Sequence, residues 1–120
     1  MQAALIGLGM VADMHVAAIA ATGGQVGLRG VFARRAQATA AFAERHGVRP
    51  YATLAEVAVD PEVDFVILAT PPDARLEAVK LLADAGKPIL MEKPIERDLP
   101  TARALVEMCE AQNVPLGVVF

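Results

Sequence analysis

Cysteine, aromatic residues and long apolar runs are scarce in this sequence, and each scarcity excludes a class of protein. Cys109 is the only cysteine, which rules out an intramolecular disulfide and a cysteine-based metal cluster, and we expect no metal site. No apolar run approaches the ~18 residues of a membrane span, and no lysine or arginine precedes Arg29, as a secretion signal would require. We therefore expect a cytoplasmic protein that does not enter a membrane.

Basic residues are also few. The formal net charge is −3, from 14 acidic against 11 basic residues, and the longest basic run is the pair Arg34-Arg35. Nucleic acid is therefore not an expected partner. Hydrophobic residues are in excess, at 55% against a usual ~45–50%. In a chain of 120 residues this composition predicts one domain, residues 1–120, built on a sheet that is covered on both faces.

Two glycines interrupt the first apolar segment. Residues 3–6 are typical of a buried strand and residues 10–21 of a helix, with Gly7 and Gly9 in the turn between them. Gly7 permits a tight bend, Gly9 lets a pyrophosphate approach the backbone, and the small Ala12 fits where helix and strand pack closely. The helix start presents free N–H groups to an anion, so the turn predicts a phosphate site, although a plain strand-to-helix turn has the same pattern. The residues expected to contact the phosphates are Gly7, Leu8, Gly9, Met10 and Val11.

Strand and helix patterns alternate along the rest of the chain. Asp73 is expected to cap a helix and a further helix is expected from Asp98, with Leu76, Val79 and Leu99 among the residues that face the core. This order predicts an α/β fold, a doubly wound and mostly parallel sheet of about six strands with helices on both faces, as in Rossmann nucleotide-binding domains. The later strands are expected at residues 26–32, 49–51, 63–69, 88–91 and 115–120, and the later helices at 36–46, 53–57, 73–86 and 98–109.

Three unusual segments each follow an expected strand: residues 7–9, Thr70-Pro71-Pro72 and Glu92-Lys93-Pro94. The carboxyl ends of parallel strands share one edge of the sheet, which is where ligands bind. Lys93 stands between a buried strand and a proline, where its ammonium can polarise a substrate hydroxyl or carbonyl beside a nicotinamide. The alternative is an exposed lysine paired with Glu92.

A pair of arginines follows the second expected strand. Arg34 and Arg35 lie in the first turn of a helix, where the dipole disfavours cations unless an anion joins them. In dinucleotide-binding folds an acid at this position binds the ribose of NAD, whereas arginine accommodates the 2′-phosphate of NADP. Ala33 and Arg34 offer no acid, so NADP is the expected cofactor, with NAD as the other candidate. A solvated surface pair is the alternative interpretation.

Taken together, three motifs resemble the N-terminal half of the glucose-fructose oxidoreductase, inositol dehydrogenase and MocA-like family over all 120 residues. They are Gly7-Leu8-Gly9-x-x-Ala12-x-x-His15, Ala69-Thr70-Pro71-Pro72 and Glu92-Lys93-Pro94. The resemblance implies an NAD(P)-dependent oxidoreductase that acts on a sugar, cyclitol or related polyol. It implies that Lys93 is catalytic, that the Lys93-Pro94 bond is cis, and that the cofactor also meets Ala69, Thr70, Pro71, Pro72 and Glu92. His15 is interpreted as packing or support for the site.

The sequence also departs from the family. Asp73 and Arg75 stand where relatives often carry histidines, and Ala33 replaces a serine that accompanies Arg34 in the NADP variant. The resemblance assigns the proton-transferring residue and most subunit contacts to a C-terminal substrate domain, which is absent from this chain. We therefore expect cofactor binding with little or no turnover, and a homo-oligomer only together with that domain. The alternatives are a non-catalytic NADP-binding regulator and a methyltransferase-like nucleoside site.

Overall fold

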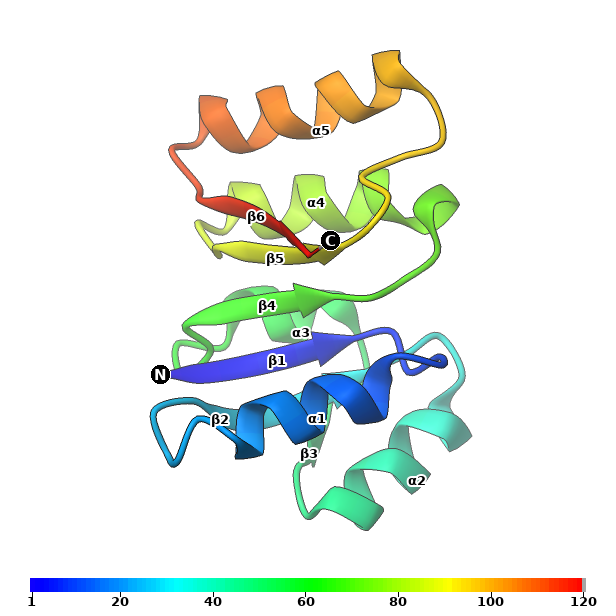
Figure 1. Cartoon of the computed structure of the whole chain (residues 1–120), viewed down its shortest axis with the longest axis vertical. Coiled ribbons are helices and arrows are strands. Elements are labelled where there is room, and N and C mark those ends of the chain that lie inside the picture. Colours follow the sequence, from blue (N-terminus) through cyan, green and yellow to red (C-terminus); the bar gives the residue numbers. More distant parts are fainter. Residues whose placement is uncertain (120) are drawn as a thin grey trace.

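A computed structural model describes residues 1–119, and its centre is a six-stranded parallel sheet in the order β3-β2-β1-β4-β5-β6. Every neighbouring pair is parallel, and the arrows of β1, β4 and β5 point the same way in Figure 1, so the loops that follow the strands lie along one edge. The predicted alternation of strands and helices is thereby confirmed. The strands are β1 (Gln2–Ile6), β2 (Gly27–Phe32), β3 (Arg49–Pro50), β4 (Phe65–Leu68), β5 (Ile89–Glu92) and β6 (Leu116–Val119).

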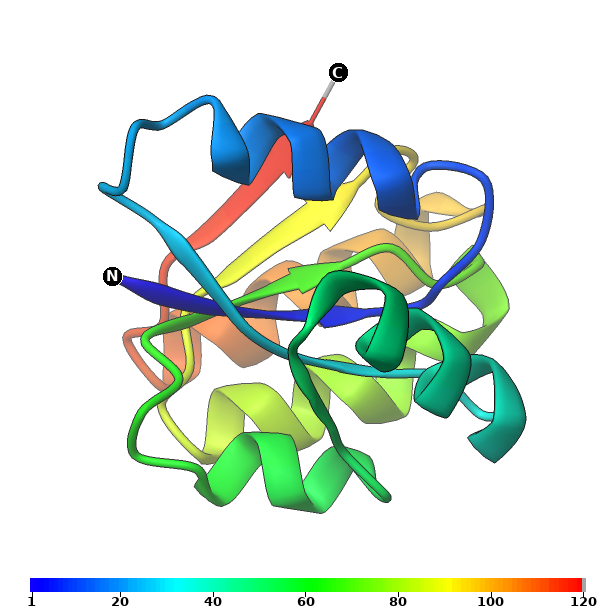
Figure 2. The same ribbon diagram turned by 90° about the horizontal axis from the view of Figure 1, so that it is seen from below.

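Helices cover both faces of the sheet, and the sheet divides the hydrophobic core in two. Helix α1 lies on one face and α3, α4 and α5 on the other (Figure 2). Alternate side chains of β1 serve the two cores: Ala3 and Leu5 pack on the α1 and α2 side, while Ala4 and Ile6 pack on the α3 to α5 side. The helices are α1 (Ala12–Ala20), α2 (Ala36–His46), α3 (Leu54–Val59), α4 (Arg75–Asp84) and α5 (Leu99–Ala111).

Local sequence signals set several helix ends. Thr53 caps α3 by accepting a hydrogen bond from the backbone N–H of Glu56 at 3.2 Å. Asp98 caps α5 through the backbone N–H of Thr101 at 2.9 Å. Gly47 ends α2 in the left-handed conformation, with φ of 64°. Among residues 1–119, none of these helices is long and apolar enough to pass through a bilayer.

Two predictions made from the helical pattern were wrong. Asp73 does not cap α4, because a short 3₁₀ turn, Pro72–Ala74, comes between β4 and the helix and gives Ala74 the cap position. Leu76 and Leu99 were expected in the core, yet they are 43% and 64% exposed. Each stands in the first turn of its helix, and these first turns lie past the ends of the strands (Figure 1). Phe120, at the end of the sixth expected strand, lies outside the described residues.

A buried polar cluster joins β2, β3 and α3. The hydroxyl of Tyr51 donates to the Asp60 carboxylate at 2.5 Å, and the Arg29 guanidinium approaches the same oxygen at 3.3 Å. These bonds, with a further one from the backbone N–H of Glu62, lower the pKa of Asp60 to about 2. Burial, followed by the bond to Asp60, raises the pKa of Tyr51 to about 12. The cluster therefore keeps the Asp60 carboxylate charged at a position just beneath the surface, where the residue is 8% exposed.

Candidate functional site

A cavity of about 670 Å³ opens at the carboxyl ends of β1, β2 and β4. Its wall is formed by the turns that follow these strands, by α3 and α4, and by Arg97 in the loop after β5. A parallel sheet has its ligand crevice where the crossover direction reverses, and here that point lies between β1 and β4. The cavity is therefore at the position that the fold predicts for a ligand.

The two glycines of the first turn serve different purposes. Gly7 has φ of +93°, and a Cβ there would lie 2.8 Å from the backbone of Ala69 and Thr70. Its N–H donates to the carbonyl of Phe32 at 2.9 Å, so the turn is fixed to β2 as well. A Cβ on Gly9 would meet nothing within 4 Å. Gly7 is therefore required by the fold itself, whereas Gly9 faces open space where a ligand can approach the backbone.

Arginines mark the rim of the cavity. Arg34 and Arg35 line it from the turn after β2, and both side chains are exposed. Thr39 holds this turn in place, because its hydroxyl accepts a hydrogen bond from the N–H of Ala33 at 3.0 Å. Arg97 lines the same cavity from the loop after β5. An anion placed between these side chains would meet charge of the opposite sign from two directions.

Thr70 and Pro71 form the wall that follows β4. The hydroxyl of Thr70 is buried and lacks a hydrogen-bond partner among the described residues. Its carbonyl oxygen is occupied by Arg75, which donates from Nε at 3.0 Å and from a terminal nitrogen at 2.8 Å. The Thr70 hydroxyl is inaccessible to solvent, so it lies beneath the wall and not on its open surface.

Arg75 is a buried cation at the start of α4, with only 2% of its surface exposed. Burial lowers the pKa of its guanidinium, and the nearby Glu96 and Glu92 raise it. Its donors reach backbone carbonyls in both the loop after β4 and the loop after β5. The sequence pattern did not single out this role, since an arginine in the first turn of a helix is normally read as a surface residue.

The segment after β5 is tied to α1. Glu92 is buried, and its carboxylate lies 2.8 Å from Nε2 of His15. Among the ion pairs of residues 1–119, Glu92 is thus joined to His15 and not to Lys93, so the simple surface pair considered for Lys93 does not form. Lys93 itself is exposed, and the Lys93-Pro94 bond is cis, as the resemblance implies. His15 thus holds the end of β5 against α1.

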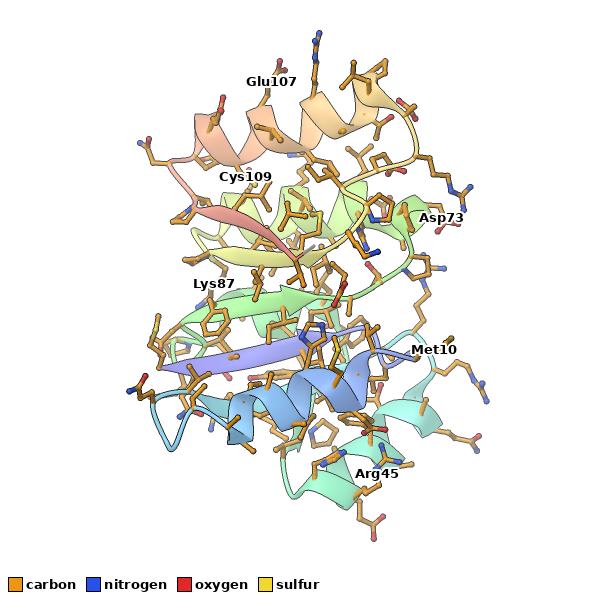
Figure 3. All side chains as sticks on the ribbon, viewed as in Figure 1. Met10, Arg45, Asp73, Lys87, Glu107 and Cys109 are labelled. Carbon is orange, nitrogen blue, oxygen red and sulfur yellow. The ribbon has the colours of Figure 1, made fainter. Side chains whose placement is uncertain are left out.

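The structure brings half of the expected site residues into one cavity. Met10 is fully exposed at the same edge of the sheet, where Figure 3 also places Asp73. The lining includes Leu54, Ala74 and Arg97, which the sequence pattern did not mark, because only the folded chain brings these segments together. The expected residues on the wall are Gly7, Leu8, Ala33, Arg34, Arg35, Thr70 and Pro71. Those outside it are Gly9, Met10, Val11, Ala69, Pro72, Glu92 and Lys93.

Known proteins with similar sequences include a reductase and a dehydrogenase. The 1,5-anhydro-D-fructose reductase of Ensifer adhaerens is 35% identical over 115 residues, which is 94% of this chain and 34% of the reductase. The inositol 2-dehydrogenase of Rhodococcus jostii is 32% identical over 107 residues, or 87% of this chain and 29% of the dehydrogenase. The chain thus spans about a third of the length of these relatives.

Solved structures agree in fold. GenD2 from gentamicin A biosynthesis, solved in complex with NAD, superposes with a TM-score of 0.88 at 30% identity over 98% of this chain and 34% of its own. A family model described as "Oxidoreductase family, NAD-binding Rossmann fold" matches residues 1–120. The cavity, the glycine turn and these similarities lead to one conclusion: the chain belongs to the glucose-fructose oxidoreductase, inositol dehydrogenase and MocA family, whose NAD-binding Rossmann fold it forms.

Proposed function

We propose that this chain is the cofactor-binding half of an NAD(P)-dependent oxidoreductase that prefers NADP(H) and acts on a sugar, a cyclitol or a related hydroxy or keto compound. One observation carries the proposal: the open space at Gly9 and the arginines at positions 34 and 35 lie at the same sheet edge, with the cavity reaching from the turn after β1 to those arginines. A dinucleotide needs a phosphate-binding turn and an adenosine site in this relation. The substrate class is taken from the reductase and dehydrogenase that the chain is similar to.

The residues present fit such a cofactor. Gly9 leaves room for a pyrophosphate at the start of α1, and the adenosine would occupy the part of the cavity that the turn after β2 lines. Arg34 would bind the 2′-phosphate with its planar, multiply donating guanidinium, and Arg35 would assist. No acid stands at Ala33 or Arg34 to bind a free ribose 2′-hydroxyl, which favours NADP over NAD.

Lys93 would act at the other end of the site. A bound nicotinamide supplies hydride transfer to or from a hydroxyl-bearing carbon. The ammonium of Lys93 would donate a hydrogen bond to the substrate oxygen and stabilise the charge that develops on it. The His15 ring is buried, with 6% of the residue exposed, so we give it a supporting role and assign proton transfer to a residue outside residues 1–119.

Cofactor preference provides the test. We expect calorimetric titration to show at least tenfold tighter binding of NADPH than of NADH, about 1.4 kcal/mol, and the Arg34→Ala variant to lose that difference. Loss of the guanidinium removes the 2′-phosphate contact, which NADH lacks, so affinity for NADH should change little. Arg103→Ala, on α5 and away from the cavity, is the matched control.

Two results would contradict parts of the proposal. Equal binding of both cofactors by the unmutated chain would mean that Arg34 does not contact the 2′-phosphate. The rest of the proposal would still stand. Binding of neither cofactor would contradict the assignment of the cavity as a dinucleotide site. The same loss in Arg103→Ala as in Arg34→Ala would show that the effect does not arise at the 2′-phosphate.

A further inference from the structure

Arg75 holds the backbone on both sides of Lys93. One terminal nitrogen of its guanidinium donates to the carbonyl of Glu92 at 2.6 Å and also to the carbonyl of Pro94. The other terminal nitrogen and Nε donate to the carbonyl of Thr70 at 2.8 and 3.0 Å. A single buried side chain thus connects the loop after β4 to the loop that carries the proposed catalytic lysine.

The sheet does not make this connection. The paired register of β4 and β5 ends at Leu68 and Met91, so beyond those residues the ladder no longer fixes the two loops to each other. The guanidinium is planar and carries its donors in a rigid fork, so bonds at both ends also fix the direction in which the loops face. Beyond the last paired residues, the bonds from Arg75 hold the two loops together.

A second contact fixes the same segment from the opposite side. The carboxylate of Glu92 is bonded to His15 of α1, while the carbonyl of Glu92 is bonded to Arg75 of α4. Helices α1 and α4 cover opposite faces of the sheet (Figure 2). The residue before Lys93 is therefore clamped from both faces, which leaves the lysine side chain exposed on a rigid backbone.

We propose that Arg75 is a positioning residue, which sets Lys93 and Thr70 at a fixed separation and so shapes the nicotinamide end of the site. The inference rests on the proposed function. The adenosine end does not need this clamp, because the turns after β1 and β2 are held by the bond from Gly7 to Phe32 and by Thr39. Loss of Arg75 should therefore weaken binding of a whole dinucleotide but not of its adenosine part.

The experiment compares two ligands on two variants. NADPH reports on both ends of the site, and 2′,5′-ADP reports on the adenosine end alone. We expect Arg75→Met to lower NADPH affinity at least tenfold and to suppress the fluorescence enhancement of the bound nicotinamide, with affinity for 2′,5′-ADP changed less than twofold. Arg75→Lys keeps the charge and part of the bonding, so it should recover part of the NADPH affinity.

Amide hydrogen exchange gives a second measurement that needs no cofactor. We expect amide exchange in residues 70–74 and 92–96 to become at least tenfold faster in Arg75→Met. Exchange in β1 to β4 should be unchanged. Arg29→Met, which removes an arginine bonded to Asp60 elsewhere in the fold, is the matched control and should leave both segments and both ligands unaffected.

The outcomes separate the two proposals. If the unmutated chain binds neither ligand, the proposed function fails, and the exchange measurement still decides the role of Arg75. If both ligands weaken equally, if neither weakens, or if exchange accelerates throughout the chain, the proposal for Arg75 is overturned. Failure of both Arg75 variants to fold would overturn it too, because the residue would then be needed for the fold as a whole.

Discussion

Replacing Gly9 with alanine is expected to weaken dinucleotide binding at least tenfold, about 1.4 kcal/mol, and to change the free energy of unfolding by less than about 0.5 kcal/mol. A Cβ at this position meets no protein atom within 4 Å, and its φ lies outside the left-handed region, so the fold accepts the methyl group. The same methyl group would occupy the space through which a pyrophosphate approaches the backbone. Calorimetry with NADPH and urea unfolding measure the two quantities.

Gly7→Ala is the matched variant with the opposite expectation. Its Cβ would lie 2.8 Å from backbone atoms of Ala69 and Thr70, at φ of +93°, so we expect a loss of about 1–3 kcal/mol of stability before any ligand is added. A destabilised Gly9→Ala, or one that binds NADPH normally, would contradict the assignment of Gly9 as the ligand-facing glycine. Equal losses of stability and of NADPH affinity in the two variants would mean that Gly7 and Gly9 do not have separate roles in the turn.

Removing the buried carboxylate of Asp60 is expected to have the largest effect on stability. Asp60→Ala leaves the Tyr51 hydroxyl buried without its acceptor and removes the partner of Arg29, which should lower the free energy of unfolding by about 2–4 kcal/mol at neutral pH. Asp84→Ala is the matched control, because Asp84 pairs with Lys80 in an exposed helical ion pair. We expect less than about 0.5 kcal/mol from that change. Urea unfolding compares the two.

The same cluster predicts how stability depends on pH. The pKa of Asp60 falls from 3.8 in the unfolded chain to about 2 in the fold, so its contribution is complete above pH 3.8 and is lost as the pH drops toward about 2. The pKa of Tyr51 rises from 10.0 to about 12, so its contribution is lost as the pH climbs through that interval. Asp60→Ala should therefore lose less stability in acid than the unmutated chain. An equally steep acid loss in both proteins would contradict this assignment.

The fold was accessible to prediction because its signals are local. Apolar runs of strand length alternate with helical patterns, Gly47 and Thr53 mark helix ends, and the parallel order follows from the alternation. The misplaced residues were those whose environment depends on where the sheet ends. Leu76 and Leu99 have core spacing, but they stand in first turns that extend past the strands. Periodicity reports a face of a helix and not what lies opposite it.

The site was less accessible, because its walls come from segments that are distant in sequence. The glycine turn and the pair Arg34-Arg35 have recognisable patterns, and both line the cavity. Arg97 and Leu54 join them only after the chain folds, and no short motif marks them. Arg75 was noticed only as a departure from the family pattern, since nothing in its neighbours predicts that its donors would meet carbonyls 17 and 19 residues away.

The place of β1 in the sheet has a consequence for how the chain acquires its structure. This strand precedes the other five strands in the chain, yet it is central: one edge pairs with β2, and the other edge pairs with β4, whose first paired residue is Phe65. Until that residue has left the ribosome, an apolar strand has a free edge that another chain can join. Parallel pairing over such separations is slow. Aggregation of nascent or unfolded chains should therefore begin at β1, and a chain truncated before β4 should not fold.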